Sequence, residues 1–313
     1  MVTPSMISPE LEPQTQRRGL LCAGLAGTLL AALQGCAQRL PVSLSSQATP
    51  AGQSLLKESA AAHGVAAFSA LSDLNVSYDG VWRALIDKLQ PVLVDSAFRG
   101  KSEERMLIRD GVIGQFHTGP GGRKFVARRP GSHPFGEVRV WYNGEEAKDA
   151  ERRAAAALVA DGYRLFLLGP MLLMNRNLVV ELGDVEAVNE HSCDVLRIQL
   201  APGLGHSNVD QVALFIDRRE RLMRRVRFSL EGLESTKGAA AEVETFDHQT
   251  LHGMRLPTRF FERLVRPVRM PVHDWKLTGL DVNRGYGAAD IAGPELGGSA
   301  RQAAAPLAAA AKS

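Results

Sequence analysis

Five short segments between His191 and Leu264 alternate apolar and polar residues, and this pattern limits what the chain can fold into. In the first of them, Leu196, Ile198 and Leu200 alternate with polar residues. Successive side chains of a β-strand point to opposite faces, so a period of two predicts strands with one apolar face. Turn signals separate the segments, which indicates an antiparallel meander. The segments cover residues 196–200, 212–217, 222–230, 241–248 and 256–264.

The sequence before this meander predicts more strands, together with helices that cover the apolar face of the sheet. Apolar residues recur with helical spacing over residues 54–71, and Ala147–Ala160 is rich in alanine. The very apolar run Tyr163–Met174 is interrupted by Gly169-Pro170, and we interpret it as helices packed on the sheet or as a lid over an apolar ligand cavity. Further strands are predicted at 74–80, 106–109, 112–117, 124–128 and 138–142, with a hairpin turn at Asp110-Gly111. The predicted fold class is mainly β (α+β), with one curved antiparallel sheet covered by helices.

The N-terminal region has the pattern of an export signal. Arg17-Arg18 precedes an apolar run over residues 20–33, which is too short for a permanent membrane-spanning helix and is typical of a signal peptide. The run ends in Leu33-Gln34-Gly35-Cys36, which resembles the lipobox of bacterial lipoproteins, whose cysteine is acylated and becomes the new N-terminus. The paired arginines resemble a twin-arginine export signal. These resemblances imply a lipid anchor at Cys36 and a place in the bacterial cell envelope, facing the periplasm. A plain signal peptide with an incidental cysteine is the alternative.

Composition divides the chain into four parts. Residues 1–35 are the predicted signal peptide, and residues 36–52 are the predicted lipidated cysteine and a flexible tether rich in Ser, Gln and Pro. Residues 53–286 are predicted to form a single domain, which is long enough to bury a core. Residues 287–313 are rich in Ala, Gly and Pro, and we expect them to be disordered.

Charge and cysteine content exclude two further features. The formal net charge is +3 and the basic residues are not clustered, so we expect no nucleic-acid partner. The three cysteines are Cys22, Cys36 and Cys193. If the first is cleaved off and the second acylated, Cys193 has no partner, and no intramolecular disulfide is expected despite an oxidising compartment. The oligomeric state does not follow from the sequence.

The order helix, strands, apolar helical insertion and longer meander resembles the lipoprotein-carrier superfamily, which includes LolA-like and LolB-like proteins and mycobacterial glycolipid-binding lipoproteins. The residues that carry the resemblance are Leu214-Phe215-Ile216-Asp217, Arg221-Leu222-Met223-Arg224-Arg225-Val226, Glu244-Thr245-Phe246-Asp247 and His252-Gly253-Met254-Arg255-Leu256-Pro257. The resemblance covers roughly residues 54–285 and is stronger to uncharacterised bacterial lipoproteins than to the carrier itself. It implies a half-barrel sheet whose concave apolar face, covered by helices, receives acyl chains.

This resemblance predicts a protein without catalytic activity or cofactor that binds a lipid or an acyl group, with lipid or lipoprotein transfer as a further role. Such a cavity needs no directional chemistry, because burial of apolar surface stabilises a complex by about 25 cal/mol per Å². Its residues are predicted from the apolar run and from inward-facing strand positions. They are Leu165, Phe166, Leu168, Met171, Leu172, Met174, Leu196, Leu214, Val226 and Phe260.

Two other classes of protein remain as alternatives, an envelope enzyme and a structural envelope protein with a filled core. Asp247-His248 and His252 have spacing seen in metal sites, but positions four apart on a strand lie about 13 Å apart unless a turn intervenes. His273 and His191 each lie near an acid, yet the chain has no Gly-x-Ser-x-Gly motif of hydrolases. We therefore predict no metal site, with His248 and His252 as the weak candidates.

Charged residues on two neighbouring segments predict the register of one hairpin. Arg225 and Arg227 face Glu242 and Glu244 if the hairpin is in simple register. We expect these pairs to form a solvent-exposed ladder on the convex face of the sheet. Exposed pairs of this kind each stabilise a fold by only a few tenths of a kcal/mol.

Overall fold

The structure is a computed structural model that describes residues 48–295 and residue 307. All of them belong to one compact unit, Arg39–Ser313. The predictions for the signal peptide, for Cys36, for most of the tether and for most of the C-terminal tail lie outside the described residues.

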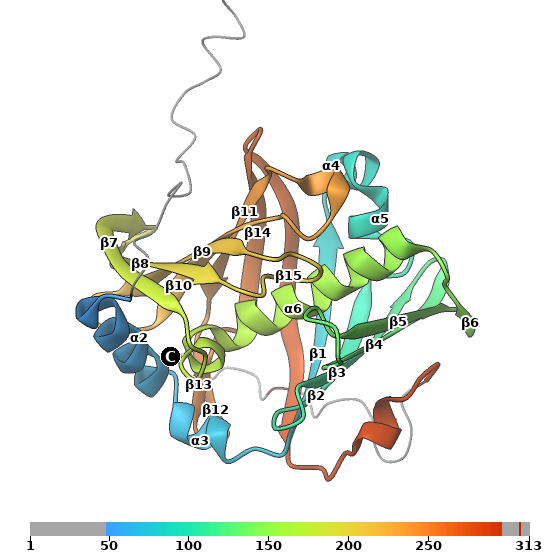
Figure 1. Cartoon of the computed structure of the whole chain (residues 1–313), viewed down its shortest axis with the longest axis horizontal. Helices are drawn as coiled ribbons and strands as arrows, with labels where there is room; N and C mark the ends of the chain where they lie inside the picture. The colour runs from blue at the N-terminus through green and yellow to red at the C-terminus, as the bar shows by residue number, and fades with distance from the viewer. Residues whose placement is uncertain (1–47, 296–306, 308–313) are drawn as a thin grey trace, which may run out of the picture. The chain divides into compact units, whose positions relative to one another are not determined.

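In the described part of the chain, thirteen strands form one antiparallel sheet that does not close into a barrel (Figure 1). Their order is β6-β5-β4-β3-β2-β1-β15-β14-β11-β10-β9-β8-β7, and β12 and β13 form a separate pair. The predicted class, a mainly β fold with an open antiparallel sheet and few helices, is confirmed. The strands are β1 (Asp73–Trp82), β2 (Lys101–Leu107), β3 (Val112–Gly119), β4 (Gly122–Arg129), β5 (Glu137–Tyr142), β6 (Glu145–Glu146), β7 (Val179–Val188), β8 (His191–Leu200), β9 (Asp210–Asp217), β10 (Met223–Ser229), β11 (Ala240–Phe246), β12 (Gln249–Leu251), β13 (Met254–Leu256), β14 (Arg259–Arg266) and β15 (Met270–Val282).

The pairing of β1 with β15 joins two parts of the sheet that are far apart in the sequence. The first part, β1 to β6, is a meander of neighbouring strands, and the second part begins only after the helical insertion. The register between the two strands runs from Leu74 opposite Val282 to Trp82 opposite His273. This one ladder therefore makes a single sheet out of two meanders.

Two of these strands have no clear signal in the sequence. In β7, Gly183 and the residue after it interrupt the alternation, and the register to β8 shifts at this point. In β15, Pro271 and Gly279 lie inside the strand, and both residue types are depleted in strands. The pairing partners of both strands come from elsewhere in the chain, so their strand conformation depends on tertiary context.

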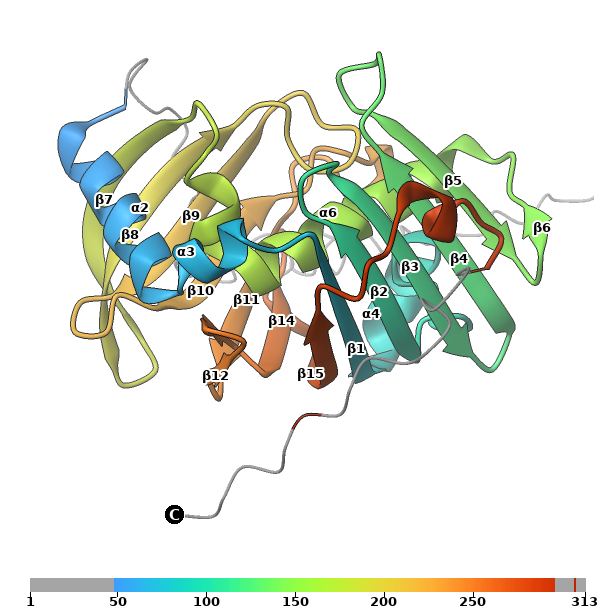
Figure 2. The same cartoon turned by 90° about the horizontal axis from the view of Figure 1, so that it is seen from below.

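The longest helix, α6 (Ala150–Leu173), lies across the concave face of the sheet, between β7–β10 and β2–β5 (Figure 2). Its N-cap is Asp149, whose side chain accepts a hydrogen bond from the backbone N–H of Arg152. Gly169 has a φ of 38° and a ψ of −115°, and this break separates the last turn from the rest. Among the described residues, α6 is the one helix long and apolar enough to cross a membrane, but 83% of its most apolar window is buried in the protein. It is therefore a core helix.

The first described helix, α2 (Pro50–Ala62), begins inside the segment predicted as a tether. The side chain of Thr49 caps it by accepting a hydrogen bond from the backbone N–H of Gly52, at 3.1 Å. The predicted helix over residues 54–71 is interrupted by Gly64, which has a φ of 88° and separates α2 from α3 (Val65–Ser69). A Cβ at Gly64 would lie 2.3 Å from a backbone oxygen of the β12–β13 hairpin, so only glycine fits.

At the other end, the folded part extends beyond the predicted boundary at residue 286. A short 3-10 helix, η2 (Ala288–Ile291), follows β15. Ile291 is fully buried and packs in one apolar cluster with Phe125 and Trp141. Arg129 also donates to the backbone oxygens of Ala288 and Ile291, both at 3.0 Å, so this segment is held to the sheet.

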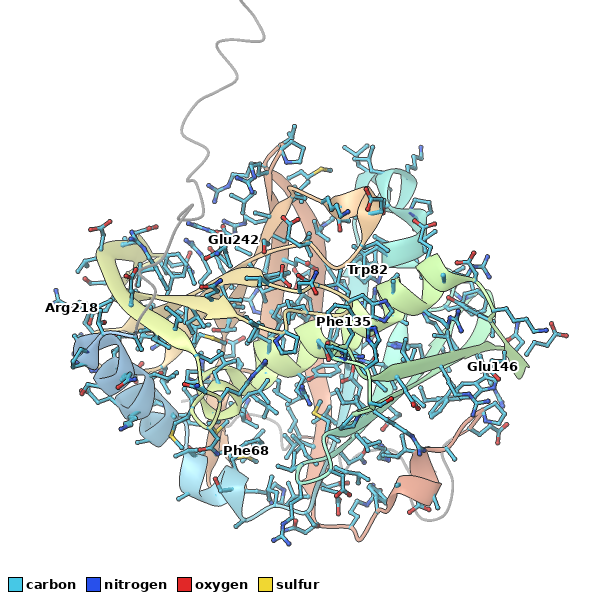
Figure 3. The ribbon with its side chains drawn as sticks, in the orientation of Figure 1. Phe68, Trp82, Phe135, Glu146, Arg218 and Glu242 are labelled. Carbon is cyan, nitrogen blue, oxygen red and sulfur yellow. The ribbon has the colours of Figure 1, made fainter. Side chains whose placement is uncertain are left out.

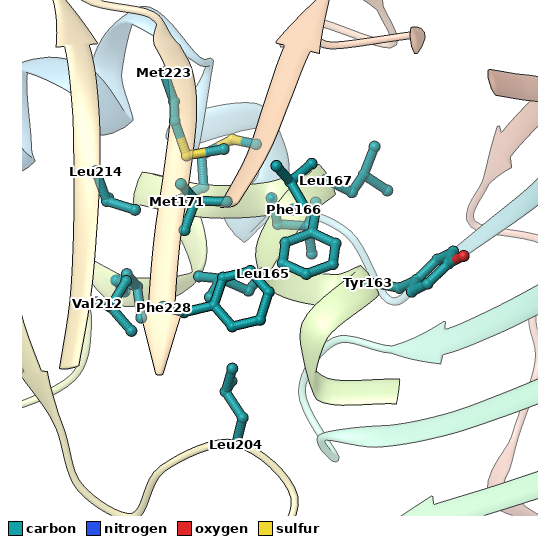
Figure 4. Close-up of a cluster of buried hydrophobic side chains, with 14 of the residues drawn as sticks. Tyr163, Leu165, Phe166, Leu167, Met171, Leu204, Val212, Leu214, Met223 and Phe228 are labelled. Atoms are coloured by element: carbon teal, nitrogen blue, oxygen red, sulfur yellow. The ribbon is translucent and has the colours of Figure 1, made fainter. Parts of the chain in front are cut away.

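The main core lies between α6 and the strands that follow it (Figure 4). Phe166 of α6 packs against Phe228 of β10, with ring centroids 5.1 Å apart. At the break in α6, a Cβ on Gly169 would lie 2.9 Å from the side chain of Met223, so the helix and β10 are in close contact there. The remaining helices are α4 (Ala84–Leu89), α5 (Pro91–Val94) and the 3-10 helix η1 (Glu234–Thr236).

The register predicted for the charged hairpin is confirmed, but the prediction that its side chains are exposed to solvent is wrong. Arg225 lies opposite Glu244, and Arg227 lies opposite Glu242. All four side chains are buried, and Glu242 is only 1% exposed. Both guanidinium groups lie over the ring of Phe215, at 5.1 and 4.9 Å, because the long arginine side chains spread across the outer face of the sheet.

We predict that Glu242→Gln lowers the free energy of unfolding by about 3–5 kcal/mol, because it removes the counter-charge of buried arginines. Glu242 accepts from Arg227 at 2.9 and 3.0 Å, and Arg263 and Arg269 each lie 3.5 Å away. The matched control is Glu146→Gln, which breaks an exposed pair with Arg139 at the outer edge of the sheet (Figure 3). Urea unfolding checks both variants, and equal stability of the two would contradict a buried network.

Candidate ligand cavity

A cavity of about 440 Å³ lies at one end of the concave face, between α6, the short helices α4 and α5, and strands β10, β11, β14 and β15. Its walls are mainly apolar, and its size lies in the range of small-molecule sites. The residues that line it are Trp82, Ile86, Leu89, Gln90, Leu93, Val94, Arg99, Leu158, Val159, Gly162, Tyr163, Phe166, Phe228, Leu230, Ser235, Thr236, Lys237, Gly238, Ala239, Ala241, Glu262, Leu264, Pro267 and Val272.

The mouth of the cavity is formed by lining residues that are exposed to solvent, Leu89, Ser235, Lys237, Gly238 and Pro267. Two large apolar side chains near them in the sequence are also exposed. Leu85, one helical turn before Leu89 in α4, is 59% exposed, and Val268, which follows Pro267, is 63% exposed. We call these two residues the apolar rim.

The inner end of the cavity is polar and centres on Arg99. Its Nη1 donates to the backbone oxygens of Leu93 and Val94, at the end of α5, and its Nη2 donates to the hydroxyl of Tyr163 at 3.3 Å. The guanidinium lies 4.5 Å from the centroid of the Trp82 ring. These contacts fix the position of a cationic guanidinium at the surface of a cavity whose other walls are mainly apolar.

Aromatic side chains connect Arg99 to strands β1 and β15 of the sheet. The ring of His273 stacks on Trp82, with centroids 3.8 Å apart and planes 3° from parallel. The hydroxyl of Tyr163 lies 3.1 Å from Nδ1 of His273. Because β15 pairs with β1, His273 and Trp82 are opposite each other in the sheet, and the ladder itself makes this contact. Burial holds the pKa of His273 well below its usual value, so the imidazole is neutral.

Two carboxyls face the same region, Glu104, which is buried, and Glu262, which is half-buried. Burial raises the pKa of Glu262, a lining residue on β14, to about 7. Burial also raises the pKa of Glu104 on β2 to about 8, although its Oε1 accepts a hydrogen bond from Gln115 at 2.9 Å. Both carboxyls are therefore protonated at mildly acidic pH and ionise around neutral pH.

Of the ten predicted cavity residues, only Phe166 lines this cavity. Leu165 and Leu172 line a separate pocket of about 240 Å³, whose rim includes Arg128 and Asp161. The other seven line neither of these two spaces. They are Leu168, Met171, Met174, Leu196, Leu214, Val226 and Phe260. All of them except Met174 belong to the main core, in which α2 and β10 pack against α6.

The residues that define the inner end of the cavity have no signal in the sequence. Arg99 lies in a stretch, residues 81–103, that has no recognisable period, and Glu262 lies in a segment that otherwise shows ordinary alternation of apolar and polar residues. For Glu262, the one local feature is a charged residue between Phe260 and Leu264, at an inward-facing position of the strand. Such a position is informative only once the register is known.

The two histidines considered as metal ligands, His248 and His252, lie at the β12–β13 hairpin, and a third histidine, His63, lies beside His248. His63 accepts from the backbone N–H of Met223 at 2.9 Å, and burial lowers its pKa to about 4. His248 lies 6.0 Å from His63 and has a pKa lowered to about 3 by burial. His252 adopts a φ of 49° in the β12–β13 turn. Among residues 48–295 and 307, no group of three or more metal-ligating side chains is found.

Cys193 is a buried thiol on β8. Burial raises its pKa to about 11. A thiol that stays protonated at neutral pH is a poor nucleophile. The structure therefore gives Cys193 a packing role, beside Phe215 in a small cluster under the outer arginines.

No family model matches the sequence, and no curated protein matches it either. The structure is similar to that of a DUF1329 family protein from Desulfovibrio piger, at 13% identity and a TM-score of 0.47, covering 79% of this chain and 98% of that one. It is also similar to a LolA superfamily protein from Nitrosomonas europaea, at 12% identity and a TM-score of 0.41, covering 77% and 97%. A third is a putative outer membrane lipoprotein-sorting protein domain from Vibrio parahaemolyticus, at 9% identity and a TM-score of 0.37, covering 77% and 96%. They include a member of the superfamily that the sequence resembles.

We predict that Glu104→Gln makes the protein less sensitive to rising pH. The unfolded carboxyl ionises near pH 4.5, whereas the folded one keeps its proton up to about pH 8. Unfolding therefore releases a proton between these values, and this group makes the wild-type protein less stable as pH rises through that window. The variant has no such proton, so its stability relative to wild type should grow by about 1.4 kcal/mol for each pH unit.

Urea unfolding at pH 5, 6, 7 and 8 measures this difference, and other titrating groups cancel because they are common to both proteins. Glu190→Gln, at an exposed turn, is the control and should keep the wild-type pH dependence. A Glu104→Gln protein whose stability stays parallel to wild type across the window would show that Glu104 is ionised when folded.

Proposed function

We propose that this protein binds the hydrocarbon chain of a lipid or acyl group in the cavity beneath α4 and α5. The observation that carries the proposal is an open, mainly apolar cavity of about 440 Å³ on the concave face of the sheet. Protein interiors leave few voids larger than a water molecule, so a space of this size and apolar lining favours a ligand over a purely structural protein.

The size of the cavity favours one chain over two. At ~30 Å³ for each water-sized group, the space holds roughly fifteen groups, and a methylene takes up about the same room. Each buried methylene stabilises the complex by about 0.8 kcal/mol. A single long acyl chain therefore fits, and this gain is enough to offset the cost of association for a small ligand.

We further propose that the protein is an envelope lipoprotein, anchored by acylated Cys36 and facing the periplasm, that exchanges its ligand with a membrane. The apolar rim, Leu85 and Val268, supports this, because both exposed side chains lie close in the sequence to Leu89 and Pro267 at the mouth of the cavity. Lys88 and Lys237 are exposed beside it and suit an anionic membrane surface. A ligand could then pass from bilayer to cavity without crossing water.

The experiment that tests binding is native mass spectrometry of the full chain carrying Cys36→Ser, which removes the proposed acylation site and allows purification from the envelope without detergent. We expect an added mass that extracts into organic solvent and proves to be a lipid. A clean apo mass that stays unliganded when phospholipid and acylated peptide are offered would overturn the proposal.

A substitution that fills the cavity should remove this mass. Val159 is a lining residue on α6, and Val159→Trp places an indole in the space, so we predict at least about a tenfold loss of affinity (~1.4 kcal/mol) for a fatty acid. Val185→Trp, at an exposed site on β7, is the matched control and should bind like wild type. Equal binding by both variants would place the ligand elsewhere.

The apolar rim should control the rate of exchange more than the affinity. We predict that Leu85→Ser with Val268→Ser slows transfer of a pyrene-labelled fatty acid from the protein to vesicles of phosphatidylethanolamine and phosphatidylglycerol. Neither residue lines the cavity, so the equilibrium affinity should not change. Val185→Ser is the control for loss of an exposed valine. Transfer at the wild-type rate would remove the rim from the mechanism.

A further inference from the structure

Arg99 is a buried cation without a close carboxylate. It is 4% exposed, and none of the ion pairs among the described residues, each defined within 4.0 Å, includes it. Its Nε has no hydrogen-bond partner. A buried charge is costly unless it is paired and hydrogen-bonded, so Arg99 has unused capacity to bind an anion.

Arg99 lines the cavity, so the anion that it can bind would be part of the ligand. One face of its guanidinium lies over Trp82, so further hydrogen bonds must come from the edge of the group. Behind Arg99, a space of about 10 Å³ is lined by Tyr163, His117 and His273, and Nε2 of both histidines has no partner. The apolar cavity therefore ends in a small polar site whose histidine Nε2 atoms and Arg99 Nε have no hydrogen-bond partner.

We propose that the cavity takes a single-chain amphiphile with an anionic head, whose oxygens accept hydrogen bonds from Arg99 and Tyr163 while the chain lies toward the mouth. The inference rests on the proposed lipid-binding function and adds the chemical class of the ligand. A carboxylate matches the planar guanidinium, and a phosphate monoester presents the same oxygens. Guanidinium donors make charge-assisted hydrogen bonds of about 1.5–3 kcal/mol, which corresponds to at least a tenfold change in affinity.

The charged and titratable groups around Arg99 decide how such a head is held at different pH. They are Tyr78 on β1, Asp95 after α5, Glu104 on β2, His117 on β3, Lys124 on β4, Tyr163 on α6, Glu262 on β14 and His273 on β15. The histidines are neutral because burial lowers the pKa of each, and Lys124 pairs with Asp95 at 2.6 Å.

Glu262 is the one carboxyl among the residues that line the cavity. Its pKa, raised by burial to about 7, means that it is mostly protonated at pH 6 and mostly ionised at pH 8. When it is protonated, the charge of Arg99 is available to the ligand, and when it is ionised it repels an anionic head. An anionic ligand should therefore bind more tightly at pH 6 than at pH 8.

The test compares three probes on the full chain carrying Cys36→Ser: hexadecanoate, a lysophosphatidic acid with the same chain, and uncharged hexadecanol. We expect Arg99→Gln to weaken binding of at least one anionic probe about tenfold or more, while hexadecanol binding changes less than about twofold. The probe with the larger loss identifies the head as carboxylate or phosphate. Arg176→Gln, which removes a cation from the other pocket, is the matched control and should leave all three affinities unchanged.

An equal loss of affinity for charged and uncharged probes in Arg99→Gln would show that Arg99 only supports the fold. That result would overturn the inference of an anionic head and leave the proposed lipid binding intact. Absence of binding for all three probes to the wild-type chain would instead overturn the proposed function. If Arg99→Gln does not fold, Tyr163→Phe and Glu262→Gln still test the inference. Wild-type affinity for hexadecanoate should fall at least about threefold from pH 6 to pH 8, and Glu262→Gln should reduce that fall, with the remainder due to Glu104. A pH-independent wild-type affinity contradicts the inference.

Discussion

The ladder between β1 and β15 is the interaction on which the rest of the structure depends. It links a meander that ends at residue 146 to one that begins at residue 179, and without it each would be a separate sheet with an uncovered edge. It also sets Trp82 opposite His273, and their stacked rings form the floor beneath Arg99. The polar end of the cavity is thus a product of the same pairing that makes the sheet continuous.

α6 covers the concave face unevenly, and this decides where a ligand can enter. Near Gly169 the helix approaches β10 so closely that the side chain of Met223 fills the space a Cβ would need, and α2 packs alongside. Toward its N-terminal half, the facing elements are the short helices α4 and α5, and a space remains between them and Phe228. Close packing at one end and short covering elements at the other leave the cavity at the end covered by α4 and α5.

The two faces of the sheet handle buried charge in opposite ways. On the outer face, arginines and glutamates neutralise one another across β10, β11 and β14, which makes that region costly to alter but chemically inert. On the inner face, the cation and the carboxyls lie near one another without forming a close pair, and burial shifts the pKa of Glu104 and Glu262 toward neutral pH. Structural ion networks and ligand sites differ in whether their polar groups already have partners. A fully paired network has no hydrogen-bonding group left for a ligand to bind.

The sequence by itself determined the class of fold, most strands of both meanders and the register of Arg225 and Arg227 against Glu242 and Glu244, because these depend on periods of two and on cross-strand charge. It also predicted that the apolar insertion covers the sheet. Only the tertiary structure decided that β15 closes onto β1, that the charge ladder is buried and that the cavity lies at Arg99 rather than along Leu165 to Met174. These outcomes depend on which distant elements meet and how well they fill the space between them, and no local pattern carries that information.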